Sequence, residues 1–166
     1  PAEGNQDHWP LMAPLLARRE LAPGEAEIRA ALAHFETMLR IRRSSPLFRL
    51  RTADDIITRV TFANTGPEQL PGVIVMILDD TSGADLDPAA RRIVVVFNSR
   101  AEEAALAVEA LRDAELSLHP LLAESADPLV RGAAFDPATG TLRVPGRTTA
   151  VFLAAQPAGL PWLPLA

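Results

Sequence analysis

The spacing of apolar residues divides the chain into a helical part and a β part that meet near residue 45. Apolar side chains between Glu25 and Arg43 recur every three or four positions, which is the spacing of one face of an α-helix. These positions are Ile28, Leu32, Phe35 and Leu39. Pro46 lacks a backbone donor and disfavours helical geometry at the residue before it, so we expect this long amphipathic helix to end near Ser44.

The residues before this helix have no sustained periodicity. Pro10, Pro14, Pro23 and Gly24 interrupt them at short intervals, and proline and glycine are strong breaks in regular structure. A short helix around residues 11–17 fits between these breaks. We therefore expect residues 1–24 to be an irregular loop that contains one short helix.

After residue 50 the pattern is that of β-strands. Residues 56–62 alternate between the two faces of an expected strand, which ends at the turn signal of residues 64–67. Residues 73–80 ("VIVMILDD") and 92–98 ("RIVVVFN") are continuous apolar runs, as expected of strands buried on both faces or at the centre of a sheet. Five further short strands are predicted at residues 105–108, 116–118, 133–135, 141–144 and 149–153. Residues 136–140 ("DPATG") have the composition of a hairpin loop.

This order of elements predicts a mainly β fold. No strand is followed by a helix long enough to cross over to a parallel neighbour, so the sheets should be antiparallel, and many short strands favour a β-sandwich. Residues 101–116 also have helical propensity, but we predict strands there because the buried runs on both sides need partners. The expected fold is an antiparallel β-sandwich preceded by one long helix and an N-terminal loop.

Composition excludes several classes of function. The 166 residues contain no cysteine, so disulfides and thiolate metal sites are excluded. The net charge of −5 argues against nucleic acid as a partner. No apolar run reaches the roughly 20 residues that span a membrane. All 16 basic residues are arginine, a bias typical of a GC-rich bacterial genome, and the sequence leaves a cytoplasmic and a secreted location equally open.

Candidate catalytic and metal-binding groups are sparse. Residues 79–87 ("DDTSGADLD") are rich in aspartate but lack the ligand spacing of a calcium loop, so we interpret them as a solvated loop between strands. His8, His34 and His119 lie far apart and outside any zinc motif. No serine lies in a nucleophile motif, and no glycine-rich phosphate loop is present. We expect no catalytic residue, metal or cofactor within this chain.

The aromatic residues argue against a free sugar-binding module. Sugar platforms use tryptophan and tyrosine, whose flat faces stack on the ring. The chain has no tyrosine, and its two tryptophans, Trp9 and Trp162, are near its ends. Five phenylalanines are predicted to be core residues: Phe48, Phe62, Phe97, Phe135 and Phe152.

Four ordered stretches resemble a known family. They are "HFETMLRIRRSSPLFRLRTADDIITRVTFANTGPEQLPGVIVMILDD", "DLDPAARRIVVVFN", "LHPLLAESADPLVRGAAFD" and "VPGRTTAVFL". Together they resemble the C-terminal part of pullulanase-type α-1,6-glucosidases, which include bacterial pullulanases and plant limit dextrinases and act on starch and pullulan. The likeness covers nearly the whole chain.

The resemblance implies a division of the chain and a role for each part. Residues 1–45 would be the end of a (β/α)8 catalytic barrel, with residues 25–43 as its last helix, and residues 46–166 would be a β-sandwich that supports the barrel. The family cleaves branch linkages with an Asp nucleophile and a Glu acid/base, which belong to barrel strands upstream of this sequence. The chain alone is therefore expected to be inactive, with the upstream barrel as its partner and α-glucan as the substrate of the parent enzyme.

One short segment also resembles a substrate loop. "NQDHWP" is similar to the family's "DNWP" loop, which follows the eighth barrel strand and borders the cleft. The resemblance implies that Asp7 accepts a sugar hydroxyl and that Trp9 packs beside it, whereas His8 departs from the family's asparagine. The alternatives are a surface loop in which Trp9 only packs and, for the whole chain, a free-standing β-sandwich that binds α-glucan or another protein. The apolar stripe of the long helix further predicts that the isolated chain self-associates.

Overall fold

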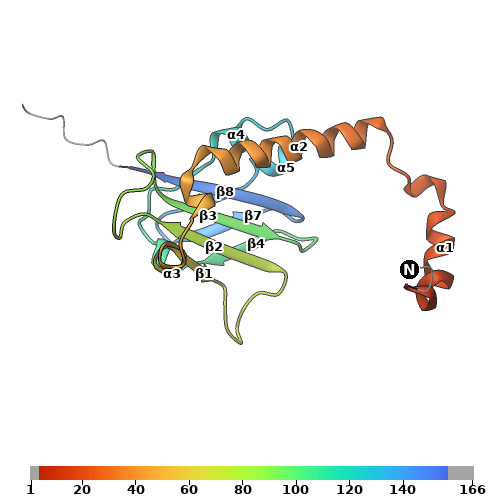
Figure 1. The fold of residues 1–166 in the computed structure, drawn as a ribbon, viewed down its shortest axis with the longest axis horizontal. Coiled ribbons are helices and arrows are strands. Elements are labelled where there is room, and N and C mark those ends of the chain that lie inside the picture. The colour runs from red at the N-terminus through yellow and green to blue at the C-terminus, as the bar shows by residue number, and fades with distance from the viewer. Residues whose placement is uncertain (1–3, 157–166) are drawn as a thin grey trace, which may run out of the picture. The chain divides into compact units, whose positions relative to one another are not determined.

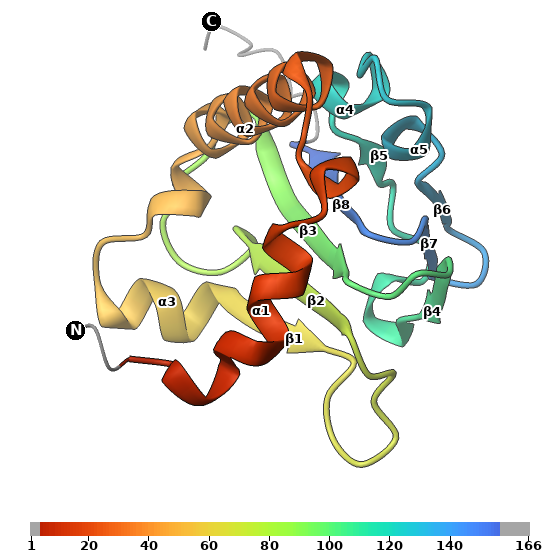
Figure 2. The ribbon, with the colours of Figure 1, turned by 90° about the vertical axis from the view of Figure 1, so that its right-hand side faces the viewer.

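A computed structural model describes residues 4–156, so Trp162 lies outside the described residues. The chain divides into two compact units, one ending at Leu39 and the other beginning at Arg40. The division falls within a single helix. Figures 1 and 2 show the elements of both units along the chain.

The first unit is helical. It contains the 3-10 helix η1 (Gln6–His8), α1 (Trp9–Leu16), the 3-10 helix η2 (Arg19–Leu21) and the first three-quarters of α2 (Glu25–Ser44). A helix was predicted at residues 11–17, and α1 begins two residues earlier because Pro10 fits the first turn, where its missing N–H has no helical partner. Pro14 lies inside α1.

The long helix has the length that the apolar spacing predicts. Acidic Glu25 and Glu27 lie in its first turn and Arg42 and Arg43 in its last, which suits the helix dipole. It ends at Ser44. Ser45 then adopts an extended conformation, and its side chain accepts a hydrogen bond from the Leu47 N–H at 3.1 Å, which starts the 3-10 helix η3 (Pro46–Arg49).

The second unit contains two antiparallel sheets (Figures 1 and 2). The larger has the order β1-β2-β3-β8-β5 and the smaller β4-β7-β6. The strands are β1 (Val60–Ala63), β2 (Val73–Asp79), β3 (Ala90–Asn98), β4 (Ala104–Ala107), β5 (Ser117–Leu118), β6 (Ala134–Asp136), β7 (Thr141–Val144) and β8 (Thr148–Ala155). Short helices connect them: α3 (Ala53–Arg59), η4 (Glu109–Leu111), α4 (Pro120–Ala123) and α5 (Pro128–Arg131).

One buried cluster joins the two sheets in a sandwich-like arrangement. It includes Val75, Val96 and Phe152 of the larger sheet and Leu142 and Val144 of the smaller one. The two continuous apolar runs are β2 and β3, adjacent inside the larger sheet, as predicted. The predicted hairpin loop at residues 136–140 is confirmed, because β6 and β7 pair directly on either side of it.

The strand predicted at residues 56–62 is partly wrong. Residues up to Arg59 belong to helix α3, and only the end of the segment is the strand β1. Thr52 caps this helix by accepting a hydrogen bond from the Asp55 N–H at 3.1 Å, and Asp54 and Asp55 occupy the first turn. This capping signal outweighs an alternation of only a few residues.

The interpretation of all five phenylalanines as core residues is also partly wrong. Phe152 is buried, and Phe135 packs against the same cluster with its ring centre 6.5 Å from that of Phe152. Phe62 and Phe97, however, are 55% and 41% exposed. The register places both on the other face of the larger sheet, because alternate residues of a strand point to opposite faces and Phe97 pairs with the exposed Ile74.

Candidate functional site

The two predicted substrate-contacting residues lie at the start of the first unit. Asp7 belongs to η1, and Trp9 is the first residue of α1, which follows η1 directly. Asp7 is exposed and Trp9 is 51% exposed. A carboxylate and an indole that are two positions apart in sequence are thus both exposed to solvent on these short helices. Their role in binding sugar stays a prediction.

The apolar stripe of α2 is exposed along the first unit. Ile28, Leu32, Phe35 and Leu39 are 57%, 54%, 59% and 45% exposed. Two residues further on, in the second unit, Ile41 is only 2% exposed. The end of the helix thus belongs to the buried interior of the second unit, whereas the preceding turns present an uncovered apolar face.

Within the second unit, His119 connects the end of α2 with α4. The His119 Nδ1 accepts a hydrogen bond from the Leu121 N–H at 3.2 Å and so caps α4. Its Nε2 lies 3.3 Å from the Ser44 Oγ, at the last residue of α2. Burial lowers the pKa of His119, which favours the neutral ring that this pair of contacts needs.

The prediction of a solvated loop between strands is partly wrong for the aspartate-rich segment, which connects β2 and β3 and exposes residues 81–85 but encloses two of its aspartates. Asp80 and Asp87 are buried, and the Asp80 side chain forms an ion pair with the buried Arg59. The other oxygen of the Asp80 carboxylate accepts hydrogen bonds from the Leu86 and Asp87 N–H groups at 2.9 and 2.8 Å. An arginine therefore balances the charge of the Asp80 carboxylate, and the loop backbone binds its second oxygen.

Two further contacts complete this loop. Arg59 Nη2 donates to the Ala84 carbonyl at 2.7 Å, and Asp87 accepts from the Ala89 N–H at 2.9 Å. Asp79 pairs with Arg92 at 2.6 Å. Burial alone would raise the pKa of Asp79, but the hydrogen bonds from Thr81 and the charge of Arg92 outweigh it and lower that pKa. The acidic residues thus make internal contacts of a structural kind.

Within residues 4–156, no group of three or more His, Cys, Asp or Glu side chains is placed to hold a metal ion. None of the helices in the described chain combines the length and apolar character needed to cross a membrane.

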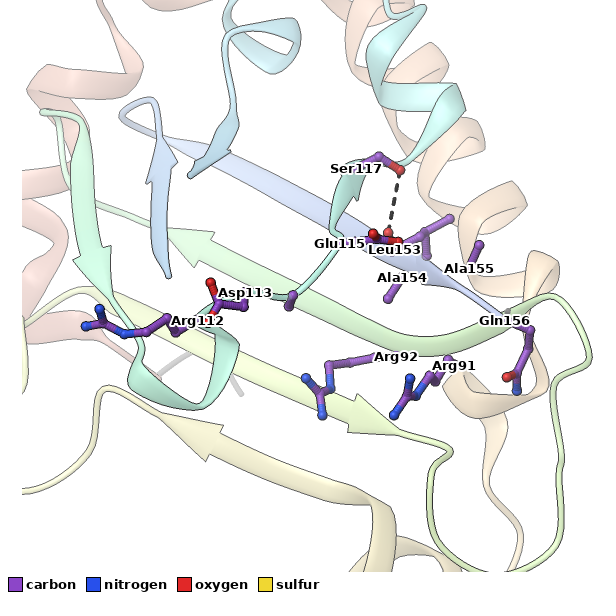
Figure 3. Close-up of a pocket in the computed structure, with 11 residues that line it drawn as sticks. Arg91, Arg92, Arg112, Asp113, Glu115, Ser117, Leu153, Ala154, Ala155 and Gln156 are labelled. Atoms are coloured by element: carbon purple, nitrogen blue, oxygen red, sulfur yellow. Dashed lines mark hydrogen bonds between the residues drawn. The ribbon is translucent and has the colours of Figure 1, made fainter. Parts of the chain in front are cut away.

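A polar hollow of about 670 Å³ lies beside the end of β8 (Figure 3). The strand register shifts between Ala90 and Arg92, and Arg91 and Arg92 both line the hollow. Across from them, Asp113 and Glu115 are exposed loop residues. Arg92 is paired with Asp79, so its charge is already balanced.

Sequence comparison identifies relatives over almost the whole chain. Residues 1–155 match the family described as "Alpha-1,6-glucosidases, pullulanase-type, C-terminal". The chain is 43% identical over 162 residues to "Pullulanase 1, chloroplastic" of Arabidopsis thaliana, covering 94% of this chain and 17% of the relative. It is 36% identical over 145 residues to the pullulanase of Klebsiella pneumoniae, covering 84% of this chain and 13% of the relative.

Structure comparison agrees. The maltotriose complex of PulA from Klebsiella pneumoniae matches 82% of this chain with a TM-score of 0.76 and 32% sequence identity. The match covers 15% of that structure's chain. The sequence thus spans less than a fifth of the length of these relatives. On the extent of these matches, the chain belongs to the family of pullulanase-type α-1,6-glucosidases, as their C-terminal part.

Proposed function

We propose that this chain is the structural C-terminal part of an enzyme that cleaves α-1,6 branch linkages in starch and pullulan. The observation that carries the proposal is the difference between the two ends of α2. Ile41 is buried in the second unit, whereas Ile28, Leu32 and Phe35 expose an apolar face. A helix shared in this way suits the last helix of a catalytic barrel, with the β unit supporting the barrel from outside.

The proposed division follows from this role. Residues 1–45 complete the barrel, and residues 46–166 form the supporting β domain. The catalytic carboxylates belong to the preceding part of the polypeptide, so the 166-residue chain is inactive alone.

Activity on pullulan tests this proposal. We expect the longer polypeptide encoded by the gene to release reducing ends from pullulan and the purified 166-residue chain to release none. Turnover by the chain alone that disappears on changing Asp113 or Glu115 to Ala would overturn the assignment, because the polar hollow would then be an active site. Absence of activity in the longer polypeptide would overturn the debranching function itself.

We also propose that Asp7 and Trp9 contact the α-glucan substrate of the parent enzyme. The support is that an exposed carboxylate and an exposed indole lie two residues apart, and that these chemistries bind sugar hydroxyls and sugar faces respectively. In the longer polypeptide, Asp7→Asn should raise KM roughly tenfold, since one hydrogen bond to a charged group is lost. Trp9→Ala should act in the same direction.

His8→Asn is the matched control for these two variants. It restores the family's residue between Asp7 and Trp9, so we expect KM to stay the same or fall. Unchanged KM in both Asp7→Asn and Trp9→Ala would contradict the contact and leave Trp9 as a packing residue.

A further inference from the structure

The polar hollow beside the end of β8 carries charged groups of both signs (Figure 3). Arg91 and Arg92 of β3 line it together with Asp113 and Glu115, which belong to the segment between η4 and β5. All four residues lie in the second unit. The volume of about 670 Å³ is within the usual range of small-molecule sites. The debranching reaction assigns no role to these residues.

A β-bulge brings two consecutive arginines into this hollow. In a regular strand, neighbouring side chains point to opposite faces of the sheet. Here Ala90 pairs with Ala155 and Arg92 pairs with Ala154, so Arg91 is an extra residue without a partner on β8. The irregularity lets both arginines line the same hollow, and Figure 3 shows their side chains leaving β3 in the same direction. Two like charges side by side repel each other, and an anion bound to both relieves that repulsion.

Arg92 is fixed by its contact with Asp79. Its Nε and Nη2 both approach the Asp79 Oδ2, at 2.7 and 2.6 Å. This contact holds the guanidinium in one orientation before any ligand arrives. The Arg92 Nη1 donates no hydrogen bond to a residue between positions 4 and 156. Arg92 therefore contributes a positioned donor, although Asp79 balances its charge.

Arg91 contributes the charge that is not balanced. Its side chain is exposed, and in the described part of the chain it forms no ion pair. The planar guanidinium group binds phosphate through parallel hydrogen bonds, which are stronger than bonds between neutral groups. A free guanidinium beside a positioned donor suits one oxyanion of the phosphate type.

Asp113 and Glu115 supply hydrogen-bond acceptors. Both are exposed, and neither forms an ion pair with a described residue, so they do not reach the two arginines. Asp113 has a left-handed φ of 59°, which aspartate tolerates, and its N–H donates to the Pro137 carbonyl at 2.8 Å. Carboxylates in fixed positions accept hydrogen bonds from hydroxyl groups and repel a second anion. The matching ligand is anionic at one end and carries hydroxyl groups at the other.

A neutral sugar alone fits this hollow poorly. No aromatic side chain is found among the described residues that line it, so a sugar ring has no flat surface on which to stack. The affinity must come from the charged end of the ligand.

We propose that the hollow binds a phosphorylated sugar, with its phosphate on Arg91 and Arg92 and its hydroxyl groups on Asp113 and Glu115. The phosphate follows from the arginine pair. The sugar rests on the proposed function, because glucose units are the material on which the parent enzyme acts. A free hexose phosphate and a phosphorylated glucosyl unit of an α-glucan present the same chemistry to the site.

Titration calorimetry with glucose 6-phosphate and the longer polypeptide tests the site. Arg91→Gln should weaken binding about tenfold, because a charge-assisted contact is lost. Arg91 is the residue to change, since Arg92 also pairs with Asp79. Asp113→Asn should weaken binding of glucose 6-phosphate about threefold but should not weaken binding of inorganic phosphate, which has no sugar hydroxyl. Glucose should bind at least about tenfold more weakly than glucose 6-phosphate.

The matched control is Arg51→Gln. Arg51 is an exposed arginine of the second unit that does not line the hollow and that forms no ion pair with any residue of the described range. This variant should bind glucose 6-phosphate like the wild type. In the wild type, higher salt should weaken binding, because the arginine contact is solvent-exposed.

Affinity gels that contain amylopectin, before and after phosphatase treatment, separate the two sources of the ligand. Retention of the wild type that falls after phosphatase treatment, and that Arg91→Gln also lowers, identifies a phosphorylated glucosyl unit of the glucan. Retention that is the same in both gels, together with binding of glucose 6-phosphate, identifies a free hexose phosphate.

Three results would overturn the proposal. The first is a wild type that binds glucose 6-phosphate no more tightly than Arg91→Gln does. The second is equal affinity for inorganic phosphate and glucose 6-phosphate, which would leave an anion site without sugar recognition. The third is retention on phosphatase-treated amylopectin that Arg91→Gln abolishes, which would make the hollow a site for neutral glucan.

Release of reducing ends from pullulan by the wild type is measured separately. A failed titration with this activity present removes the sugar phosphate site and leaves the debranching function standing. Binding of glucose 6-phosphate without activity on pullulan removes the debranching function instead.

Discussion

The loop between β2 and β3 and the first turns of α2 distribute charge and apolar surface in opposite ways. In the loop, Asp80 and Asp87 are buried, and the Asp80 carboxylate is contacted by the buried Arg59 of α3 and by backbone N–H groups. In α2, four large apolar side chains on one face are roughly half exposed or more. One region hides charge, and the other displays apolar surface.

This difference distinguishes a region that is stabilised by contacts within the fold from a region whose apolar side chains are not covered by other residues. A buried charge is tolerated only if its partners are close by in the same fold, and Asp80 has such partners in Arg59 of α3 and in two N–H groups of the loop. An exposed apolar stripe leaves no buried group without a partner, and covering it with another surface is favourable because apolar area is removed from water. Mutations in the loop should therefore lower the stability of the isolated chain. Mutations in the apolar stripe of α2 should instead change how the chain associates.

The largest effect is expected from Asp80→Asn. It leaves the buried Arg59 guanidinium with only the more distant Asp55 carboxylate, 3.7 Å from its Nε, which should lower the free energy of unfolding by about 3 kcal/mol. Urea denaturation measures this value. Asp85→Asn is the control, because Asp85 lies exposed in the same loop and should change stability by less than about 0.5 kcal/mol. Equal effects of the two variants would show that the ion pair has no special role.

A smaller loss is expected from His119→Ala, about 1–2 kcal/mol at neutral pH, because the cap of α4 and the contact with Ser44 both disappear. The pKa of His119 is lowered in the folded state, so its contribution is present above the unfolded value of about 6.5 and is lost as the pH falls through the folded value. The stability difference between wild type and variant should thus shrink between neutral and mildly acidic pH. His34→Ala, at an exposed position, is the control and should change stability at neutral pH by less than about 0.5 kcal/mol.

Asp79→Asn should cost less, at most about 1 kcal/mol, because the Asp79–Arg92 pair is partly exposed and screened by solvent. The pKa of Asp79 is lowered in the folded state. Its contribution should be present above about pH 4 and vanish as the pH falls through the lower folded value. Urea titrations at several pH values measure it, and a difference that grows on acidification would contradict the assignment.

The smallest effect on folding is expected from Leu32→Glu with Phe35→Glu, below about 0.5 kcal/mol for the second unit, since both side chains are exposed. The same variant should shift a self-associating chain toward monomer, which light scattering measures. His34→Glu with Thr37→Glu adds equal charge on the opposite side of the helix and should leave association unchanged. A wild-type chain that is monomeric at high concentration, or a variant that unfolds, would show that the stripe needs no partner.

The order of the elements could be predicted from sequence because it depends on local patterns. The helix that ends at Ser44, the central pair of strands and the hairpin loop of residues 136–140 each have a signal within a few residues. Helical periodicity, continuous β-branched runs and turn residues act over such short distances. Where two local signals conflicted, as between the alternation of residues 56–62 and the cap at Thr52, the sequence pattern gave the wrong element for α3.

Burial was decided by tertiary structure alone. Phe62 and Phe152 have the same side chain, yet one is exposed and the other is core, because the strand register decides which face each occupies. Asp80 is buried and Asp85 is exposed, although both belong to one aspartate-rich run, because Arg59 lies 21 residues earlier in sequence and reaches only the former. Local sequence specifies which elements form, whereas pairing between distant residues determines which side chains are enclosed and which stay available for contact.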